Sequence, residues 1–563
     1  MRVPAVAALA SCACVVITLG GCGVQPGNRV GVSTGSSRNV SSNTSQTSNA
    51  SNTTQSNPSA KAAGFSNTTS ERSSSSQSGY GSSQSVSNPS AGANGASQSG
   101  SLSGQTAAQG QTTSGTQSGS NSGNPSQTAT DLVPISSGGA SNLVQARFAA
   151  NAWNGMGEAA LLVTPPNSYG LYGSLLYIMV DGSQSSTGKP QATLVDEHAI
   201  SASISPDGKW LMVEAMVNEG TVSLPNFQTH LLFESVDGKK RIDLGHVPYV
   251  DGDWTGPETY LYTDGSGHLY TVKPGKQPSV SALRLPAGVT INALRVNPQS
   301  GLVAMDEVVP DSNGNVLDRH DVIALWDPST NKLKSLLTAS PSNGYILGPW
   351  TNDGSALFYW TDPMHSGSMA ADGLQLSSMN TQGVTQPVAT TLTGGSAVLP
   401  VSSAQAVLQV GSSRYLFVKK TIEVWNGQKL VSLPGQPVAP SSTQVWPTVS
   451  PDGQVVAYSI GNTLPISAGI TQTSQWWQQL QLMTVNLSTG QSKVLKTAGS
   501  GVVTPVFNGD GSRIAFLDGD TLDVVNANDS GSKQPVFSVT PVDAASYPQW
   551  NVSLPIQIAD YQP

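Results

Sequence analysis

A repeat of about 50 residues is the feature that most constrains how this chain can fold. In each repeat an apolar residue, often Trp, precedes a tight polar turn, and the two most complete turns are Ser205-Pro206-Asp207-Gly208 and Ser450-Pro451-Asp452-Gly453. Successive anchors lie 42 to 58 residues apart. The anchors are Trp153, Ile204, Trp254, Val296, Trp350, Val401, Val449, Phe507 and Trp550. Nine anchors at this spacing indicate repeated structural units.

Each turn is followed by apolar strands with a period of two, such as 210–213 and 231–233, and by a short outer strand. Four antiparallel strands per unit predict an all-β fold, a β-propeller of four-stranded blades. Eight strand pairs favour eight blades, with seven as the alternative. Because only 13 residues follow Trp550, we expect the C-terminal segment to complete a composite blade with strands near 145–163. No window shows a sustained helical period.

The Ser-Pro-Asp-Gly turn followed by an apolar strand resembles the propeller repeat of the TolB-like periplasmic proteins and of prolyl-oligopeptidase propellers, and the architecture resembles Trp-Asp-repeat (WD40-like) propellers. Only the turns at 205–208 and 450–453 are intact. The resemblance spans residues 145–563 in architecture, implies a β-propeller, and indicates no particular member of these families.

The N-terminus has the pattern of a secretory signal. Arg2 is followed by an apolar run from Val3 to Leu19, and Leu19-Gly20-Gly21-Cys22 resembles the bacterial lipobox. The resemblance implies that residues 1–21 are a lipoprotein signal peptide and that Cys22 is lipidated, which anchors the protein to the extracytoplasmic face of the cell membrane. The alternative is an ordinary secretory signal with an incidental Cys. Since all three Cys lie in the first 22 residues, the folded part has neither a disulfide nor a thiolate metal site.

The next segment, residues 22–140, consists mainly of Ser, Gly, Asn, Gln and Thr, a composition typical of a disordered tether. Whether its length is adapted to crossing a wall layer is left open. The β-propeller domain is predicted over residues 141–563. Residues 131–563 carry 21 basic and 33 acidic residues, a net charge of −12, which argues against nucleic acid as a partner.

Long insertions are predicted between the second and third strands of several blades, at 216–227, 309–320, 362–372 and 461–475. They should open on one face, opposite the Pro-Asp-Gly turns, and this face is the predicted binding surface. The alternative is that insertions gather there only because the turn face is tightly packed. Apolar and aromatic residues could grip a peptide or stack on a sugar, and the candidates are Trp476, Trp477, Phe227, Met364 and His365. In the alternative interpretation, one Trp packs under its own loop while the other faces water.

Catalytic and cofactor motifs are not found in the sequence. There is no Gly-x-Ser-x-Gly elbow, the six His show no motif spacing, and the hydrolase domain of prolyl oligopeptidases is missing. The segment Asp311–Asp318 has calcium-like spacing, but Val316 and Val322 stand where Gly and Glu belong. No catalytic residue, cofactor or metal ligand is therefore predicted.

These observations favour a lipid-anchored envelope propeller that binds a protein or a glycan. The alternatives are a propeller hydrolase or lyase acting on wall or extracellular polysaccharide, and a purely structural envelope component.

Overall fold

The computed structural model describes residues 133–134 and 144–563, except for 165–172, 186, 222–225, 248–249, 311–318, 342, 402–403, 436–440, 529–530 and 542–555. The chain divides into two units, residues 1–33 with 127–563 and residues 34–126, and every described residue belongs to the first. The predicted signal peptide, Cys22, nearly all of the tether, the calcium-like segment and Trp550 lie outside the described residues, and the domain boundaries stay predictions. No helix in the described part is long and apolar enough to cross a membrane.

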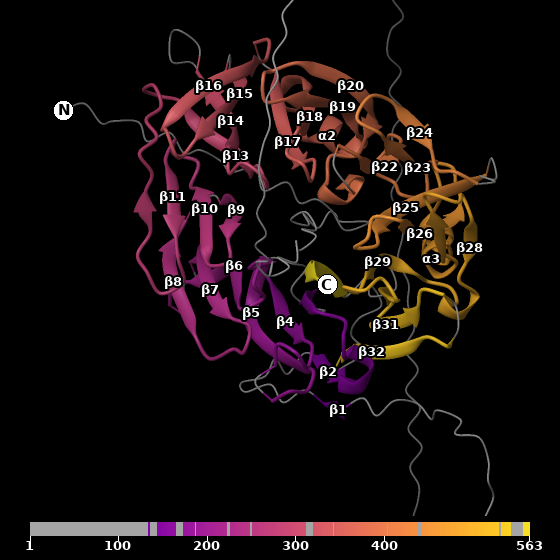
Figure 1. Ribbon diagram of the computed structural model, residues 1–563. Helices are drawn as coiled ribbons and strands as arrows, with labels where there is room; N and C mark the ends of the chain where they lie inside the picture. Colours follow the sequence, from indigo (N-terminus) through magenta and orange to yellow (C-terminus); the bar gives the residue numbers. More distant parts are fainter. Residues whose placement is uncertain are drawn as a thin grey trace, which may run out of the picture. The chain divides into compact units, whose positions relative to one another are not determined.

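The described residues form antiparallel β-sheets that follow one another around a ring (Figure 1). This arrangement confirms the predicted all-β propeller. Inner strands such as β4 (Ser174–Val180) and β14 (Val303–Val309) are almost continuously buried, because both faces of each sheet pack against neighbouring sheets. The core therefore consists of apolar layers between successive sheets, as with Ile323, Tyr345 and Leu357.

Pairing along the chain forms successive groups of four strands, which we number in chain order. Group 1 contains β33 (Ile556–Gln562), β3 (Glu158–Val163), β4 and the first half of β5 (Gln191–Ile204). Group 2 contains the second half of β5, β6 (Trp210–Asn218), β7 (Phe227–Ser235) and β8 (Arg241–His246). Group 3 contains β9 (Asp251–Gly256), β10 (Thr259–Thr263), β11 (Leu269–Val272) and β12 (Ser279–Val280). Group 4 contains β13 (Thr290–Val296), β14, β15 (His320–Asp327) and β16 (Lys332–Thr338).

The remaining groups follow the same order. Group 5 contains β17 (Gly344–Trp350), β18 (Ala356–Asp362), β19 (Leu374–Asn380) and β20 (Thr385–Thr391). Group 6 contains β21 (Val398–Pro400), β22 (Ala406–Val410), β23 (Thr421–Trp425) and β24 (Leu430–Ser432). Group 7 contains β25 (Ser442–Val449), β26 (Val455–Asn462), β27 (Gln481–Asn486) and β28 (Ser492–Val494). Group 8 contains β29 (Val503–Phe507), β30 (Arg513–Asp518), β31 (Thr521–Asn526) and β32 (Gln534–Pro541).

We interpret each group as one blade. On this interpretation, the strand pairing of the described residues corresponds to eight blades, the larger of the two predicted numbers. The helical segments are short and lie between strands. They are α1 (Ala150–Trp153), η2 (Pro363–His365), α2 (Gly367–Asp372), η3 (Gly395–Ala397), α3 (Ile470–Gln478) and η4 (Lys496–Ala498).

The two ends of the described chain close the ring. The C-terminal strand β33 pairs with β3, which confirms the predicted composite blade. The N-terminal strands β1 (Val133–Pro134) and β2 (Val144–Phe148) instead extend group 8 beyond β32, so residues 144–148 do not join the composite blade as expected. In Figure 1 the indigo start and the yellow end of the ribbon lie together. Each end thus pairs with a strand from the other end of the chain, and both ends secure the closure.

The anchor Trp153 differs from the sequence prediction because it lies in α1 and not at the end of a strand. Its buried ring packs edge-on against Tyr561, and Nε1 donates a hydrogen bond to Gly157 O at 2.9 Å. Arg513 of β30 donates to the carbonyl oxygen of Ala152 at 3.2 Å. In group 1 the innermost strand is β33 and not a strand that contains Trp153. The segment 149–157, which includes Trp153, therefore connects group 8 to group 1.

The turns between first and second strands share one hydrogen-bond pattern. Ser450 Oγ donates to Asp452 Oδ1 at 2.5 Å and accepts from Val455 N at 2.9 Å. Thr351 Oγ1 makes the corresponding bonds to Asp353 and Ala356, at 2.8 and 3.0 Å. Threonine therefore replaces serine without changing the turn, because either hydroxyl can both donate and accept.

Buried and half-buried polar side chains connect neighbouring blades. Asp560 Oδ2 accepts from Ile204 N at 2.7 Å between groups 1 and 2, and Asp251 Oδ1 accepts from Leu294 N at 2.8 Å between groups 3 and 4. Gln409 Oε1 accepts from Trp446 N at 2.9 Å between groups 6 and 7. These bonds satisfy amides of innermost strands that have no further strand beside them.

Candidate functional site

Three described insertions join the second and third strands of consecutive blades, at 363–373 in group 5, 411–420 in group 6 and 463–480 in group 7. Because antiparallel strands alternate in direction, these connections all open on one face, opposite the Pro-Asp-Gly turns. We call residues 363–372, 411–420 and 463–480 the loop platform. The predicted insertions at 362–372 and 461–475 belong to it.

Polar contacts tie the three segments of the loop platform together. Arg414 Nε donates to Asp372 Oδ1 at 2.9 Å, and Arg414 Nη2 donates to Ser368 O at 3.0 Å. Leu464 N donates to Phe417 O at 2.9 Å. Each segment therefore contacts the next, and the three can act as one surface.

Lys420 holds the middle segment from within. Its side chain is only 1% exposed, and Nζ donates to the carbonyl oxygens of Ser412, Ser413 and Tyr415 at 3.2, 2.9 and 3.0 Å. Burial lowers the pKa of the Lys420 ammonium to about 8. Sequence reasoning missed this residue, because one of two adjacent lysines before an ordinary strand carries no sign of burial.

The two predicted Trp residues lie at the base of the platform. Trp476 is buried, donates from Nε1 to Asn462 O at 2.7 Å, and meets Phe417 edge-on with ring centroids 6.2 Å apart. Trp477 is half-buried and stacks on Trp446, with centroids 5.3 Å apart. Trp476 thus packs under its own loop, as in the alternative interpretation, while Trp477 has one ring face covered by Trp446.

The large apolar side chains that are most exposed on the loop platform are aliphatic. Met369 of α2 is 46% exposed, and Ile466 and Ile470 of the 463–480 segment are each 68% exposed. Large apolar side chains exposed together on one face mark surfaces for contact with other proteins.

The predicted residues Met364 and His365 lie in η2, at the start of the first platform segment. The side chain of Met364 is outside the described part. His365 Nε2 lies 3.7 Å from Asp321 Oδ1, and Asp321 is fully buried together with Asp306. Burial raises the pKa of both carboxyl groups. Sequence reasoning missed Asp306 and Asp321, although a carboxylate inside an apolar run such as Val303-Ala304-Met305-Asp306 is a usable signal.

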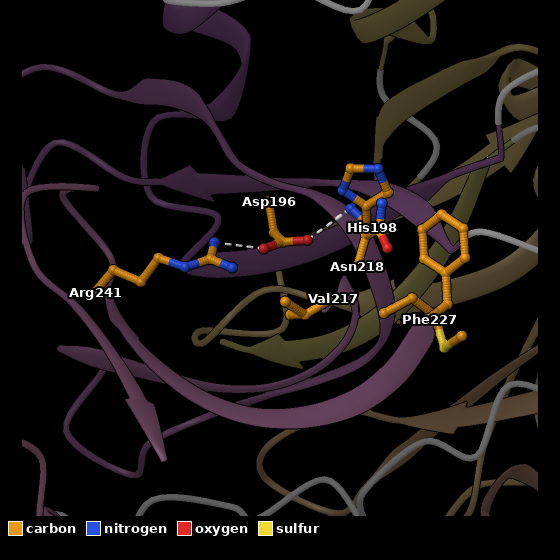
Figure 2. A pocket seen from close by; sticks show the side chains of 7 residues that line it. Asp196, His198, Val217, Asn218, Phe227 and Arg241 are labelled. Atoms are coloured by element: carbon orange, nitrogen blue, oxygen red, sulfur yellow. Dashed lines mark hydrogen bonds and ion pairs between the residues drawn. The ribbon is translucent and has the colours of Figure 1, made fainter. Parts of the chain in front are cut away.

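Phe227 belongs to a different region, at the start of β7 in group 2. It borders a pocket of about 170 Å³ (Figure 2). The other residues that line the pocket are Asp196, His198, Met216, Val217, Asn218 and Arg241. Figure 2 shows Phe227 beside His198 and Asn218, with Arg241 on the far side of Asp196. The predicted candidates therefore lie in groups 2, 5 and 7 and do not form one site.

Arg241 neutralises two buried carboxylates at this pocket. Nη1 donates to Asp196 Oδ2 at 2.5 Å and to Glu234 Oε1 at 2.6 Å. Burial raises the pKa of Glu234 to about 7, although Arg241 opposes the shift. Because these groups satisfy one another, the contact is a structural link between β5, β7 and β8. Among the described residues, no group of three or more His, Asp, Glu or Cys side chains is arranged to hold a metal ion.

Among the comparisons with known proteins, only the comparison with solved structures finds proteins that are similar to this chain. No family model and no curated protein matches the sequence. An oligogalacturonate lyase in complex with manganese is 12% identical, with 66% of this chain and 94% of that chain covered and a TM-score of 0.36. Dipeptidyl peptidase 4 of Porphyromonas gingivalis is 8% identical, with 72% and 59% covered and a TM-score of 0.41.

A TolB-like protein of Agrobacterium tumefaciens is 13% identical, with 55% of this chain and 98% of that chain covered and a TM-score of 0.26. At these identities and TM-scores, the similarity assigns no activity or ligand to this chain.

Proposed function

We propose that this protein is a lipid-anchored, extracytoplasmic β-propeller that binds a protein partner through its loop platform. The observation that carries the proposal is the exposure of Met369, Ile466 and Ile470 on loops that are held in place. Arg414 holds the segment of Met369 through Asp372. The bonds from Leu464 N to Phe417 O and from Trp476 Nε1 to Asn462 O hold the segment of Ile466 and Ile470. Ordered loops lose little conformational entropy when they bind, so exposed apolar side chains on them can contribute to affinity.

The chemistry of the platform favours a protein over a glycan. Sugars stack on the faces of aromatic rings, but Trp476 is buried and Trp477 has one face against Trp446. The side chains that project most are aliphatic, and aliphatic residues suit the apolar patches of protein surfaces. A glycan is therefore an outcome of the test and not part of the proposal.

Substitution of the exposed Ile residues tests the binding surface. Ile466→Asp together with Ile470→Asp should lower affinity for the envelope partner about tenfold or more, since a desolvated apolar contact is replaced by a charge. The matched control is Val384→Asp, because Val384 is 67% exposed but lies in the turn between β19 and β20 on the opposite face.

The partner is identified by photo-crosslinking from position 470 in intact cells, and its affinity for each purified variant is measured by calorimetry. An equal loss of affinity in Val384→Asp, or retention of a glycan in place of any protein, contradicts the proposal. The melting temperatures of all variants should agree within a few degrees, because each side chain is exposed.

The anchor is tested separately. Cys22→Ala should shift the protein from the membrane fraction to soluble or precursor forms, because the acyl chains that hold it to the membrane would be lost. Cys12→Ala is the control and should have no effect, since Cys12 lies in the predicted signal peptide. A processed Cys22→Ala protein that still sediments with membranes would show that the lipoprotein interpretation is wrong.

A further inference from the structure

Two carboxyl groups meet between groups 4 and 5, directly beneath the loop platform. Asp306 of β14 and Asp321 of β15 are 0% and 1% exposed. Asp306 Oδ2 accepts from Asn292 Nδ2 at 3.0 Å, and Asp321 Oδ2 accepts from Tyr345 N at 3.0 Å. Within the described residues, the Oδ1 atoms of both carboxyl groups have no hydrogen-bond partner.

Groups of both charges surround this pair. The titratable or charged groups that face it are Asp251 of β9, Arg319 before β15, Tyr345 of β17 and His365 of η2, and Asp362 of β18 lies beside His365. Asp251 is already paired with Arg295. His365 Nε2 is 3.7 Å from Asp321 Oδ1, too far for a hydrogen bond, and is itself without a partner in the described residues.

Asp306 pairs with Ile323 and Asp321 pairs with Val308, so the two side chains lie on the same face of neighbouring strands. Two carboxylates placed in this way in a dry interior resist being ionised together. We infer that Asp306 and Asp321 share one proton and that, through His365, this pair makes the position of residues 363–372 depend on pH. The raised pKa of each carboxyl group, caused mainly by burial, agrees with this arrangement.

The position of His365 fits such a role. Its backbone has a φ of 47°, a left-handed conformation that costs free energy in a residue other than glycine. Gly344 faces both partners, and a Cβ atom there would come within 2.6 Å of the imidazole and of Asp321 Oδ2. Only glycine at this position leaves room for the ring to approach the carboxylate.

Within the loop platform, two contacts connect His365 to α2 and to the neighbouring segment. Ser366 N donates to Asp362 Oδ1 at 3.0 Å, and α2 begins at the next residue. Asp372 at the end of α2 pairs with Arg414. A protonated His365 would close the gap to Asp321 while the pair still carries one negative charge, and would hold α2 and Met369 in place. The consequence for binding rests on the proposed function, but the movement does not.

The sign of the pH effect on stability follows from the raised pKa values. In the window between the ordinary Asp pKa near 4 and the raised values, the folded protein binds more protons than the unfolded chain. The contribution of the pair to stability is therefore present at low pH and is lost as the pH rises through the folded pKa. Three variants separate the two parts of the inference, because each removes a different group.

Hydrogen exchange of the protein without any partner measures the loop directly. Peptides covering 363–372 should exchange about tenfold more slowly near pH 5.5 than near pH 7.5 after correction for intrinsic rates. His365→Gln should abolish this difference but keep the pH dependence of the melting temperature. Asp306→Asn imitates the singly protonated pair, so it should keep the loop difference and flatten the melting-temperature profile. Asp321→Asn should abolish the loop difference and only weaken the pH dependence of the melting temperature, because Asp306 stays buried.

Equal exchange of 363–372 at the two pH values in the wild type, or a pH difference retained in His365→Gln, overturns the inference. Peptides from 463–480 serve as the internal control and should not respond. A melting temperature that rises with added calcium or zinc and no longer depends on pH would identify a cation site, and this result would also overturn the inference. If these measurements overturn the pH inference, the expected effect of Ile466→Asp and Ile470→Asp on binding is unchanged. The two proposals are therefore tested separately.

Discussion

The two faces of the propeller are built in different ways. On the turn face, short segments such as 351–356 and 450–455 close through hydrogen bonds among residues at most five apart. On the platform face, the segments are long and are held by distant residues, as when Arg414 pairs with Asp372. The turn face therefore depends on local sequence, whereas the platform depends on the assembled ring. Surfaces that bind partners are commonly built in the second way, on loops that a scaffold positions.

The largest effect is expected from removing the ring at the base of the platform. Trp476→Ala should lower the free energy of unfolding by about 3 to 5 kcal/mol, because it leaves a cavity against Phe417 and frees the carbonyl oxygen of Asn462. Urea denaturation measures the loss. Trp477→Ala, at a half-buried position, is the matched control and should cost less. Unchanged stability with lost partner binding would instead make Trp476 a surface anchor.

A somewhat smaller loss is expected at Lys420. Lys420→Met keeps most of the side-chain volume but leaves the carbonyl oxygens of Ser412, Ser413 and Tyr415 without their donor, which should cost about 2 to 3 kcal/mol. Lys429→Met is the control, since Lys429 is exposed in the turn between β23 and β24. Denaturation of both variants at pH 7 gives the comparison. If both lose the same stability, Lys420 does not hold the 411–420 segment.

The sequence predicted the turn face better than the platform for a physical reason. A hydroxyl or amide at the first turn position and Asp two residues later act within one short window, so Ser205, Ser450 and Thr351 could be recognised from their neighbours. The contacts of Lys420 and the meeting of Asp306 with Asp321 depend on how separate strands pack. Periodicity reports that a strand is buried but not which polar atom faces which.

The predicted binding residues show the same limit. The loops that carry Trp476, Trp477 and His365 could be placed on one face from strand order alone. Which ring would be covered depended on Trp446 and Phe417, which lie on other segments. Phe227 follows the connection between the second and third strands of group 2, as predicted, but this blade is not one of the three that form the loop platform, and Phe227 borders the pocket with His198.

The faces also differ in how their carboxyl groups respond to pH. On the turn face, the hydroxyl of Ser235 and the ammonium of Lys239 lower the pKa of Asp237 to about 2, so its contribution is present above pH 4 and lost as the pH falls toward 2. Beneath the platform, burial raises the pKa of Asp306, and that contribution is lost as the pH rises. The Asp306→Asn variant removes the second response and leaves the first.

The smallest effect is expected from a single turn. Ser450→Ala removes the hydroxyl that bridges Asp452 and Val455 N, while the backbone bond from Ser450 N to Val455 O remains, so the cost should be about 1 kcal/mol. Thr351→Ala should cost a similar amount, because its hydroxyl makes the same two bonds. Urea denaturation of both variants tests whether an intact and a degenerate turn are energetically equal. Neither substitution should change partner affinity, since both lie on the face opposite the loop platform. If one substitution greatly lowers the free energy of unfolding and the other does not, the two turns contribute differently to the stability of the ring despite their shared geometry.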